Sequence, residues 1–327
     1  MASTDRILVT GATGFIGQHL VNQLLAEGIT VRILTRGSRP LPENWSRRVE
    51  VALGDLTDSA VVPSATAGCQ VVYHLAGETR EPLRMQTTNV QGTQYLLSAC
   101  LKEGVHYVVY LSSVGVMGAR RPGPVDETVP CHPQNAYEQS KYAAEQLVVA
   151  WSAQTGIPAV ALRPTIVFGD GPRAAADSLL AWLRAIQVGR FLFFDRQAVA
   201  NYVYVGDLIA ACCQAAQARL TGAYIVADPC LLSEFVTAAA EALGVPKPKR
   251  AIPLPIAYLA ALGMQTLGPL LHVTNPPLTI ARVRALSNRT RYCATRLTTA
   301  SGWQAQMGYR VGLRRTVDWY RQTGQLA

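Results

Sequence analysis

The sequence has little charge and only four lysines. Charged residues make up 16% of the 327 residues, below the share of roughly 25% that is usual for globular proteins. The net charge of +9 comes almost wholly from arginines scattered along the chain. Because no run of basic residues is interleaved with aromatic residues, the sequence does not favour a protein that binds nucleic acid. We expect some arginines to face an anionic cofactor instead.

Paired cysteines and a secretory leader are also missing. The seven cysteines show neither C-x-x-C spacing nor an even number. Such a set predicts buried free thiols in a reducing compartment and gives no reason to expect a metal site. The N-terminal stretch MASTDRILVTG passes directly into a strand-like run and lacks the apolar core of a signal peptide. We therefore predict a cytoplasmic protein without a bound metal.

A glycine-rich turn stands between a strand-like run and a helical stretch. RILVT (6–10) is followed by TGATGFIG, by residues with helical periodicity, and by VRILT (31–35). Gly11 permits a tight turn, Gly14 lets the backbone approach a pyrophosphate, and Gly17 lets the helix pack on the strand. The start of the helix offers free N–H groups to the phosphates. A glycine turn without a ligand is the alternative, but this context predicts a dinucleotide in contact with Gly11, Thr13, Gly14, Phe15, Ile16 and Gly17.

Strand-like and helix-like segments alternate as far as about residue 168. Such alternation predicts an α/β fold with a Rossmann-type, doubly wound parallel sheet. The pattern changes after FGDGPR, and the chain beyond Pro229 is helical or irregular with many prolines. We expect a nucleotide-binding lobe made of residues 1–170 and 201–228. Residues 171–200 and 229–327 are expected to form a smaller, mostly helical substrate lobe.

The stretch NAYEQSKYAAEQ (135–146) places Tyr137 four residues before Lys141. This spacing puts both side chains on one side of a helix. The pair is either part of an active site or an exposed helix surface. A cation near a tyrosine favours the phenolate, which lets the tyrosine exchange a proton near neutral pH.

Further motifs follow in order along the chain. They are GDLTD (54–58), HLAG (74–77), NVQGT (89–93), YLSSVGVMG (110–118), LRPTIVFG (162–169) and YVYVGDLIAA (202–211). With the glycine turn and the Tyr137–Lys141 pair, they make the sequence similar to the extended short-chain dehydrogenases/reductases, the NAD-dependent epimerase/dehydratase-like family. Within that family it resembles the 3β-hydroxysteroid dehydrogenases and dihydroflavonol reductases. The resemblance implies an NAD(P)-dependent oxidoreductase and a homodimer that pairs through the helices at 86–103 and 137–153.

The resemblance also implies roles for individual residues. Tyr137 is expected to be the general acid or base, Ser113 to hydrogen-bond the same substrate oxygen, and Lys141 to hold the nicotinamide ribose as well. Ser112 is the rival of Ser113, although the family pattern favours Ser113. Asn89 is expected as a fourth polar member of the catalytic group, with helix capping or another structural role as the alternative. Further cofactor contacts, besides Tyr137 and Lys141, are expected at Asp55, Leu56, Leu75, Ala76, Gly77, Pro164 and Ile166.

The end of the second strand indicates which cofactor binds. NAD-dependent members of the family usually place an acid there, which hydrogen-bonds the ribose hydroxyls. This sequence has Thr35 followed by Arg36, with Arg39 close behind. Without a carboxylate to repel it, a 2′-phosphate can accept a bidentate contact from an arginine. NADP(H) is therefore expected in preference to NAD(H), unless both arginines are merely solvated loop charges.

Two positions argue against a nucleotide-sugar substrate. Ala200 and Ile166 stand where nucleotide-sugar members of the family carry an arginine and an asparagine that pair with the diphosphate. Because a buried diphosphate without partners is penalised, we expect a small hydrophobic ketone, aldehyde or alcohol. A nucleotide-sugar epimerase or dehydratase is one alternative, and a non-catalytic NADP(H)-binding redox sensor is another. The expected substrate pocket contains Thr79, Met117, Ile166, Phe168, Phe191 and Tyr204.

Residues 251–271 form an uncharged stretch of 21 residues, preceded by three cations at positions 247, 249 and 250. Three prolines leave a helix of roughly a dozen residues, which is too short to span a bilayer. We expect a lid helix over an apolar substrate. Peripheral contact with a membrane surface is the alternative, and an integral span is not expected.

Overall fold

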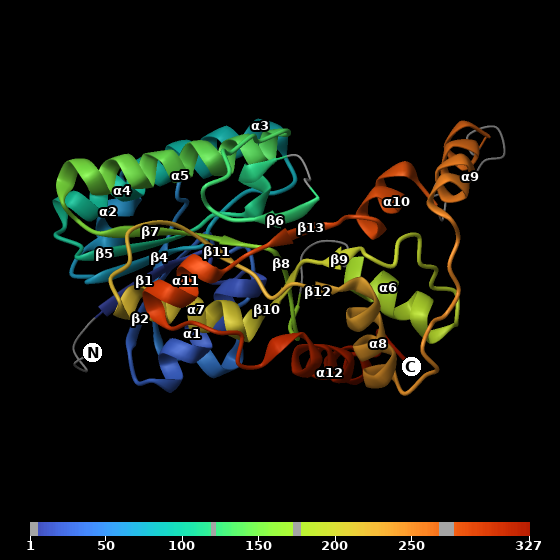
Figure 1. The fold of residues 1–327 in the computed structure, drawn as a ribbon. Coiled ribbons are helices and arrows are strands. Elements are labelled where there is room, and N and C mark those ends of the chain that lie inside the picture. Colours follow the sequence, from blue (N-terminus) through green and yellow to red (C-terminus); the bar gives the residue numbers. More distant parts are fainter. Residues whose placement is uncertain (1–5, 119–121, 173–177, 268–277) are drawn as a thin grey trace.

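The computed structural model describes residues 6–118, 122–172, 178–267 and 278–327. A seven-stranded sheet with the order β11-β7-β5-β4-β1-β2-β3 forms its centre, and all its neighbouring strands are parallel (Figure 1). This arrangement confirms the predicted Rossmann-type sheet. In chain order the strands are β1 (Arg6–Thr10), β2 (Thr30–Thr35), β3 (Val49–Leu53), β4 (Val71–His74), β5 (Tyr107–Leu111), β7 (Ala159–Pro164) and β11 (Gly222–Val226).

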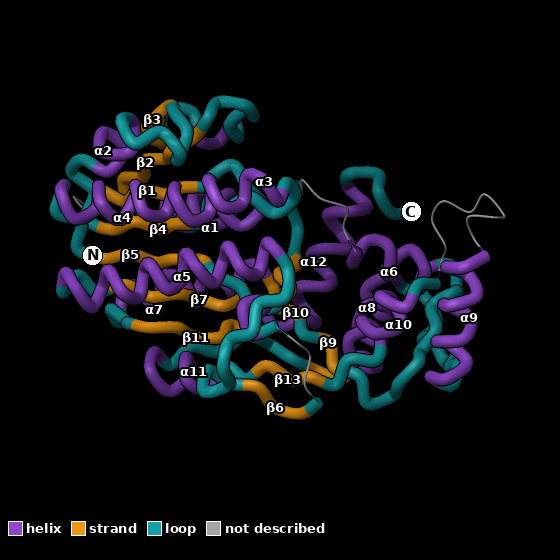
Figure 2. The backbone as a smooth tube through the Cα atoms, turned by 90° about the horizontal axis from the view of Figure 1, so that it is seen from above, coloured by secondary structure: helices purple, strands orange, loops and turns teal. Residues whose placement is uncertain are grey.

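Helices cover both faces of this sheet (Figures 1 and 2). One face carries α1 (Phe15–Ala26) and α7 (Val205–Gln217), which pack against each other. The other carries α2 (Val61–Thr66), α4 (Gly92–Lys102) and α5 (Ala136–Thr155). The strands in between are buried on both sides; β5 and β7, for example, consist of buried residues throughout. Such strands read as continuous apolar runs in the sequence, which is why they could be predicted.

A second group of helices lies beside the carboxyl ends of the strands (Figure 1). There α8 (Leu232–Leu243) packs against α6 (Ser178–Gln187) and α12 (Gly308–Gln322). Helices α9 (Leu254–Leu267) and α10 (Ile280–Leu286) pack on each other and form an arm at the far end. Residues 268–271 of the uncharged stretch lie outside the described residues. No helix in the described segments has the length and hydropathy needed to cross a membrane.

Three short two-stranded ladders connect these parts. β8 (Ile166–Phe168) pairs with β10 (Tyr202–Tyr204), and β9 (Val199–Ala200) with β12 (Cys230–Leu231). β13 (Thr290–Tyr292) pairs with β6 (Gly123–Val125), and α11 (Thr295–Ser301) contacts β11. Residues 290–301 thus return to the larger lobe, although the sequence places them in the smaller one. The remaining bounds of the two lobes stay a prediction.

Short helical turns complete the described structure. They are a 3-10 turn at Glu43–Trp45, the helix α3 (Pro82–Met85) with a π-helical turn at Gln86–Gln91, and a 3-10 turn at Val114–Met117. The π-helical turn runs directly into α4. Such a turn inserts an extra residue into the helix and changes the direction of the side chains around it.

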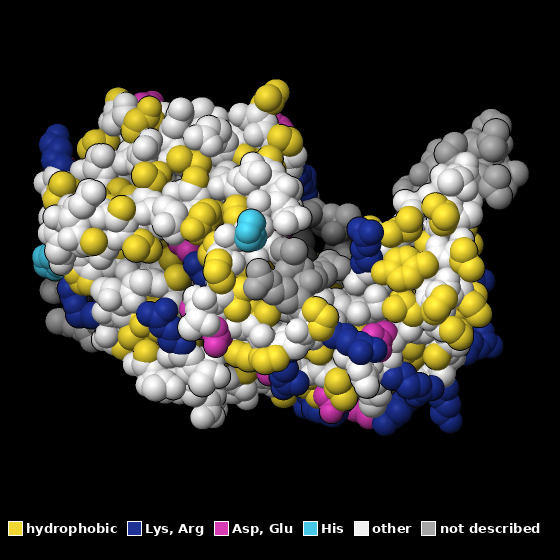
Figure 3. Space-filling view, turned by 45° about the horizontal axis from the view of Figure 1, so that its top comes forward, with side chains coloured by type: hydrophobic (Ala, Val, Ile, Leu, Met, Phe, Trp, Pro, Cys, Tyr) yellow, Lys and Arg dark blue, Asp and Glu magenta, His cyan; other side chains and the backbone are white. Residues whose placement is uncertain are grey.

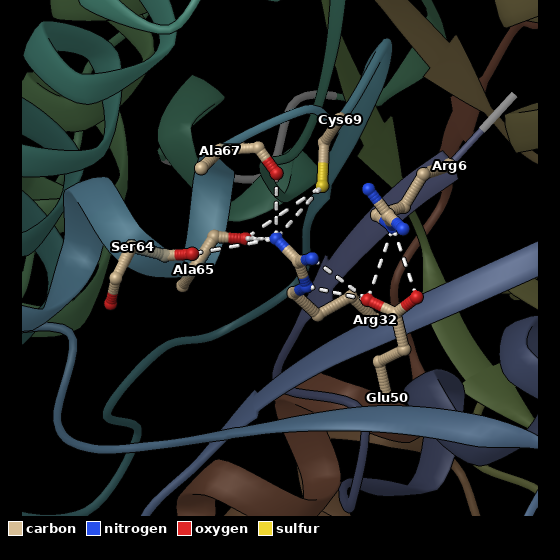
Figure 4. Close-up of polar contacts among 7 residues, drawn as sticks. All are labelled: Arg6, Arg32, Glu50, Ser64, Ala65, Ala67 and Cys69. Carbon is tan, nitrogen blue, oxygen red and sulfur yellow. Dashed lines mark hydrogen bonds and ion pairs between the residues drawn. The ribbon is translucent and has the colours of Figure 1, made fainter.

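Two arginines that do not face a cofactor hold the edge of the sheet together (Figure 4). Glu50 on β3 accepts hydrogen bonds from Arg6 on β1 and Arg32 on β2, at 3.0 and 2.9 Å from their Nε atoms. Arg32 also donates to the carbonyl oxygens of Ala65 and Ala67 at the end of α2, at 3.2 and 2.7 Å. A cation at a helix C-terminus satisfies carbonyl groups that lack partners within the helix. Some of the basic residues are therefore structural.

Candidate active site

A groove of about 220 Å³ lies at the carboxyl ends of β1, β2 and β4. This is where ligands bind in open parallel sheets. It brings together most of the residues predicted to contact the cofactor, namely Gly11, Thr13, Gly14, Arg36, Arg39, Asp55, Leu56, Leu75, Ala76 and Gly77. The residues that line the groove do not include the other predicted contacts, namely Phe15, Ile16, Gly17, Tyr137, Lys141, Pro164 and Ile166.

Close backbone packing explains two of the glycines. Gly11 has a φ of +71°, and a Cβ atom there would lie 2.6 Å from the backbone nitrogen of Ala76. A Cβ atom on Gly17 would lie 2.2 Å from the carbonyl oxygen of Gly11. Any side chain at either position would push the turn away from β4 or the helix away from the turn. These two glycines therefore fix the tight turn between β1 and α1 that borders the groove.

The groove also contains residues that were not singled out as cofactor contacts: Thr10, Leu34, Ser38, Gly54, Glu78 and Thr88. Most of them are immediate neighbours of residues that were predicted. The positions of Thr10 and Leu34 could have been predicted from the strand pattern, because each lies at the carboxyl end of a strand that borders the groove. Thr88 lies in the π-helical turn, whose geometry the sequence does not reveal.

Cations and an acid meet at the β2 end of the groove. The Nη1 atom of Arg36 lies 3.7 Å from the Asp55 carboxylate, and its side chain is 53% exposed. Burial acts to raise the pKa of Asp55, but hydrogen bonds from Thr57 and the charge of Arg36 bring it below its usual value. Arg39 donates to the carbonyl oxygen of Thr13 at 3.4 Å. Two exposed guanidinium groups therefore stand where the ribose of an adenine nucleotide would meet the second strand.

The expected catalytic tyrosine lies in the first turn of α5. Asn135 caps this helix by accepting a hydrogen bond from the backbone N–H of Glu138 at 3.0 Å. The Ser113 side chain lies beside Tyr137, close enough to affect its pKa, and its Oγ accepts a hydrogen bond from the backbone N–H of Gly115 at 3.1 Å. Burial raises the pKa of Tyr137 above its ordinary value, and the neighbouring Ser113 counteracts this rise. Tyr137 therefore holds its proton at neutral pH and lies beside the serine that the family pattern favours.

The neighbouring Ser112 has a different partner. It is 4% exposed and donates to the Oε2 atom of Glu145 at 2.6 Å. Glu145 also forms a buried ion pair with Arg163 at 2.5 Å. Because its hydroxyl is committed to this buried network, Ser112 is not available to a substrate, and of the two serines only Ser113 is placed beside Tyr137.

Lys141 lies one turn beyond Tyr137 and is almost wholly buried, with 4% of its surface exposed. Burial lowers its pKa to about 7, against the opposing charge of Glu145. Its Nζ atom lies over the Tyr110 ring, 4.3 Å from the centroid. A Cβ atom on Gly77, which lines the groove, would lie 3.9 Å from the same Nζ. The amine of Lys141 therefore stands at the inner end of the cofactor groove.

Asn89 is committed to positioning this end of the groove. Its Oδ1 accepts from the backbone N–H of Glu78 at 2.7 Å. Its Nδ2 donates to the Glu78 carbonyl oxygen at 3.0 Å and to the Ser140 hydroxyl at 2.9 Å. These bonds tie the loop after β4 to the helix that carries Tyr137 and Lys141. The geometry favours the structural alternative for Asn89 over a direct contact with substrate.

Two of the expected substrate-pocket residues, Phe168 and Tyr204, are in contact, with ring centroids 5.8 Å apart. Phe168 has no exposed surface and contacts the rings of Tyr202 and Phe235, while Phe191 is 4% exposed and packs on Phe193 and Trp182. Both belong to the main core, and their place in a substrate pocket stays a prediction. Met117 is also buried, at 3% exposure, whereas Thr79 and Ile166 are exposed.

Tyr204, the last of these residues, faces a different cavity. Its hydroxyl donates to Asp170 at 2.7 Å, and it lines a space of about 570 Å³ between α1, α7 and α12. This cavity shares no lining residue with the groove that contains Gly11 and Arg36. Tyr204 is therefore not placed to line a pocket at the inner end of the groove.

The sequence and the fold were compared with those of known proteins, and both are similar to members of one enzyme family. The profile of the NAD dependent epimerase/dehydratase family matches residues 7–227. The 3beta-hydroxysteroid-dehydrogenase/decarboxylase isoform 2 of Arabidopsis thaliana is 30% identical over 95% of this chain, which spans 61% of that relative's length. The 3 beta-hydroxysteroid dehydrogenase/Delta 5-->4-isomerase of Mycobacterium tuberculosis is 33% identical over 80% of this chain and 76% of its own. Among solved structures, a Thermus thermophilus UDP-glucose 4-epimerase complex with NAD is 27% identical, with a TM-score of 0.71 over 97% of this chain and 99% of its own.

Proposed function

The chain belongs to the NAD dependent epimerase/dehydratase family, and we propose that it is an NADP(H)-dependent oxidoreductase that interconverts a ketone or aldehyde and an alcohol on a hydrophobic small molecule. The observation that carries this proposal is the position of three side chains. Ser113 lies beside Tyr137, and Lys141 lies one helical turn away at the inner end of the groove. This arrangement supports a proton donor close to the cofactor groove.

A dinucleotide fits the groove because Gly11 and Gly14 line it without side chains, and because Gly11 and Gly17 let the turn pack closely on β4 and the helix on the turn. When bound, the nicotinamide supplies or accepts the hydride. Tyr137 keeps its proton at neutral pH, since burial raises its pKa, and it can donate that proton to a carbonyl oxygen during reduction. Ser113 donates a hydrogen bond to the same oxygen as negative charge develops there. Lys141 stabilises the phenolate that remains, in proportion to the fraction of its amine that is protonated.

A nucleotide-sugar epimerase is the second candidate, and the likeness to the UDP-glucose 4-epimerase structure favours it. Against it stand Ala200, which is buried in β9 with 3% exposure, and Ile166 in β8. Neither side chain offers a hydrogen bond to a diphosphate. The proposed substrate is therefore apolar, as is that named for the two hydroxysteroid dehydrogenase relatives.

Calorimetry with UDP-glucose in the presence of NADP⁺ distinguishes these candidates. We expect no detectable heat of binding for UDP-glucose, because the diphosphate finds no partners at positions 166 and 200. Binding in the micromolar range would favour the epimerase and contradict the proposed substrate class. NADP⁺ titrated alone serves as the control that the cofactor groove is intact.

A further inference from the structure

Helix α9 presents an apolar face to solvent. Ala257 and Ala261 have no exposed surface and form its inner face. On the outer side Ile256, Leu259 and Leu262 are 56%, 70% and 50% exposed. Their spacing of three places them in one stripe along the helix. A helix that only meets water carries charged or polar residues on such a face, whereas α9 contains no charged residue.

The charge near this stripe in the sequence has one sign. From residue 242 to residue 317 the sequence contains no Asp or Glu but eleven Lys and Arg residues. Three of these cations, Lys247, Arg289 and Arg310, pair with acids from other segments. Lys249 and Arg250 stand in the loop before α9, and Arg284 lies on α10, which packs against it. All three are exposed. Figure 3 shows hydrophobic side chains gathered on this arm with Lys and Arg side chains beside them. Such a surface complements one that is anionic outside and apolar underneath.

The arm projects from the same side of the molecule as a second exposed hydrophobic residue. In Figure 1 the arm of α9 and α10 rises on the same side of the molecule as α3. Leu83 on α3 is 94% exposed, the most of any large hydrophobic residue in the described part of the chain. Figure 3, in which this side is turned forward, shows the surface hollowed between the arm and the larger lobe. A flat surface in contact with both projections would therefore cover the opening of this hollow.

We propose that the arm docks the protein on an anionic lipid surface. Ile256, Leu259 and Leu262 enter the boundary between headgroups and acyl chains, and Lys249, Arg250 and Arg284 contact the headgroups. The contact is peripheral, because α9 has 14 residues and a span needs about 20. Since stable attachment takes two signals, the apolar stripe and the cations act together. This proposal rests on the arm alone and does not depend on the identity of the substrate.

Cosedimentation with lipid vesicles tests the docking. The purified chain is mixed with phosphatidylcholine vesicles or with vesicles that also contain phosphatidylglycerol. We expect binding to the anionic vesicles, weaker binding to the neutral ones, and a decrease as salt is added, because the headgroup contacts are screened. Equal binding to both vesicle types at all salt concentrations, or no binding to either, would overturn the proposal.

Two sets of variants separate the signals. Leu259→Glu combined with Leu262→Glu is expected to lower the fraction bound to anionic vesicles at least about tenfold, because both charges oppose insertion. Lys249→Gln combined with Arg250→Gln is expected to remove the preference for anionic over neutral vesicles. Val51→Glu is the matched control. The exposed fraction of Val51, 49%, is nearly the same as that of Leu262, but Val51 lies on β3 at the opposite end of the molecule. Unchanged NADP⁺ binding and thermal unfolding show that each variant is folded.

Two other roles for the stripe give different results. If it is the interface with a second copy of the chain, the Leu259→Glu, Leu262→Glu variant changes the oligomeric state in solution, while the parent does not bind vesicles. If the stripe is a lid over the substrate, the variant changes KM for a water-soluble substrate and vesicle binding is again absent. Either result rejects lipid docking without affecting the proposed oxidoreductase activity.

Discussion

The amine of Lys141 lies 4.3 Å from the centre of the Tyr110 ring, buried beneath the groove. The ring face attracts a cation only weakly compared with a carboxylate, and burial disfavours the charged form. Its pKa is therefore lowered to about 7 although Glu145 lies one turn further along α5. The same positive charge contributes to lowering the pKa of His74 to about 3, after burial as the main cause, so His74 is neutral between Thr10 and Thr93.

This lowered pKa predicts how the stability of the cofactor-free protein depends on pH. Between about pH 7 and about pH 10 the unfolded chain keeps the Lys141 proton while the folded chain has released it, so the free energy of unfolding rises with pH over this window. Lys141→Met lacks this contribution. The stability of the parent relative to Lys141→Met should therefore increase as pH rises from 7 to 10, measured by urea unfolding at several pH values. A constant difference would show that Lys141 keeps its proton in the folded protein.

Arg36 is expected to determine the preference for NADP(H). Arg36→Ala should weaken NADPH binding by about 1–3 kcal/mol, as expected for the loss of a charge-assisted hydrogen bond. NADH binding should hardly change, because its ribose carries no 2′-phosphate. Fluorescence titration with both cofactors measures the two effects. Lys102→Ala, which removes an exposed cation from α4, is the control; equal affinity of the parent for NADH and NADPH would contradict the role of Arg36.

Tyr137→Phe is expected to abolish turnover and leave cofactor binding intact, because only the hydroxyl that donates the proton is lost. Lys141→Ala should impair both turnover and cofactor affinity. Steady-state kinetics and cofactor titration together give this comparison. Tyr142→Phe removes a hydroxyl from the same helix and should leave turnover unchanged. Activity in Tyr137→Phe at about a tenth of the parent rate would be incompatible with a general acid at this position.

The sequence predicted the sheet and most of the cofactor groove, because both depend on local patterns. Buried strands read as apolar runs, and Gly11 and Gly17 stand where backbones approach each other. The substrate side could not be predicted in the same way. Phe168 is buried by Phe235 from α8, a residue 67 positions later in the sequence. Asn89 lies in a π-helical turn and donates a hydrogen bond to Ser140 on α5, and the sequence pattern did not predict this turn. Long-range packing decides both cases.

The transfer of a labelled hydride tests the proposed reaction most directly. The protein is incubated with NADPH that carries deuterium at both positions of the reactive carbon of the nicotinamide and with a set of hydrophobic ketones and aldehydes, including 3-ketosteroids. We predict that deuterium appears in the alcohol product in one equivalent per NADPH consumed, and that Tyr137→Phe transfers none. Epimerisation returns the hydride to the sugar and consumes no cofactor. Conversion of a UDP-sugar without net NADPH oxidation, together with no labelled alcohol from any of these carbonyl compounds, would contradict the proposed function.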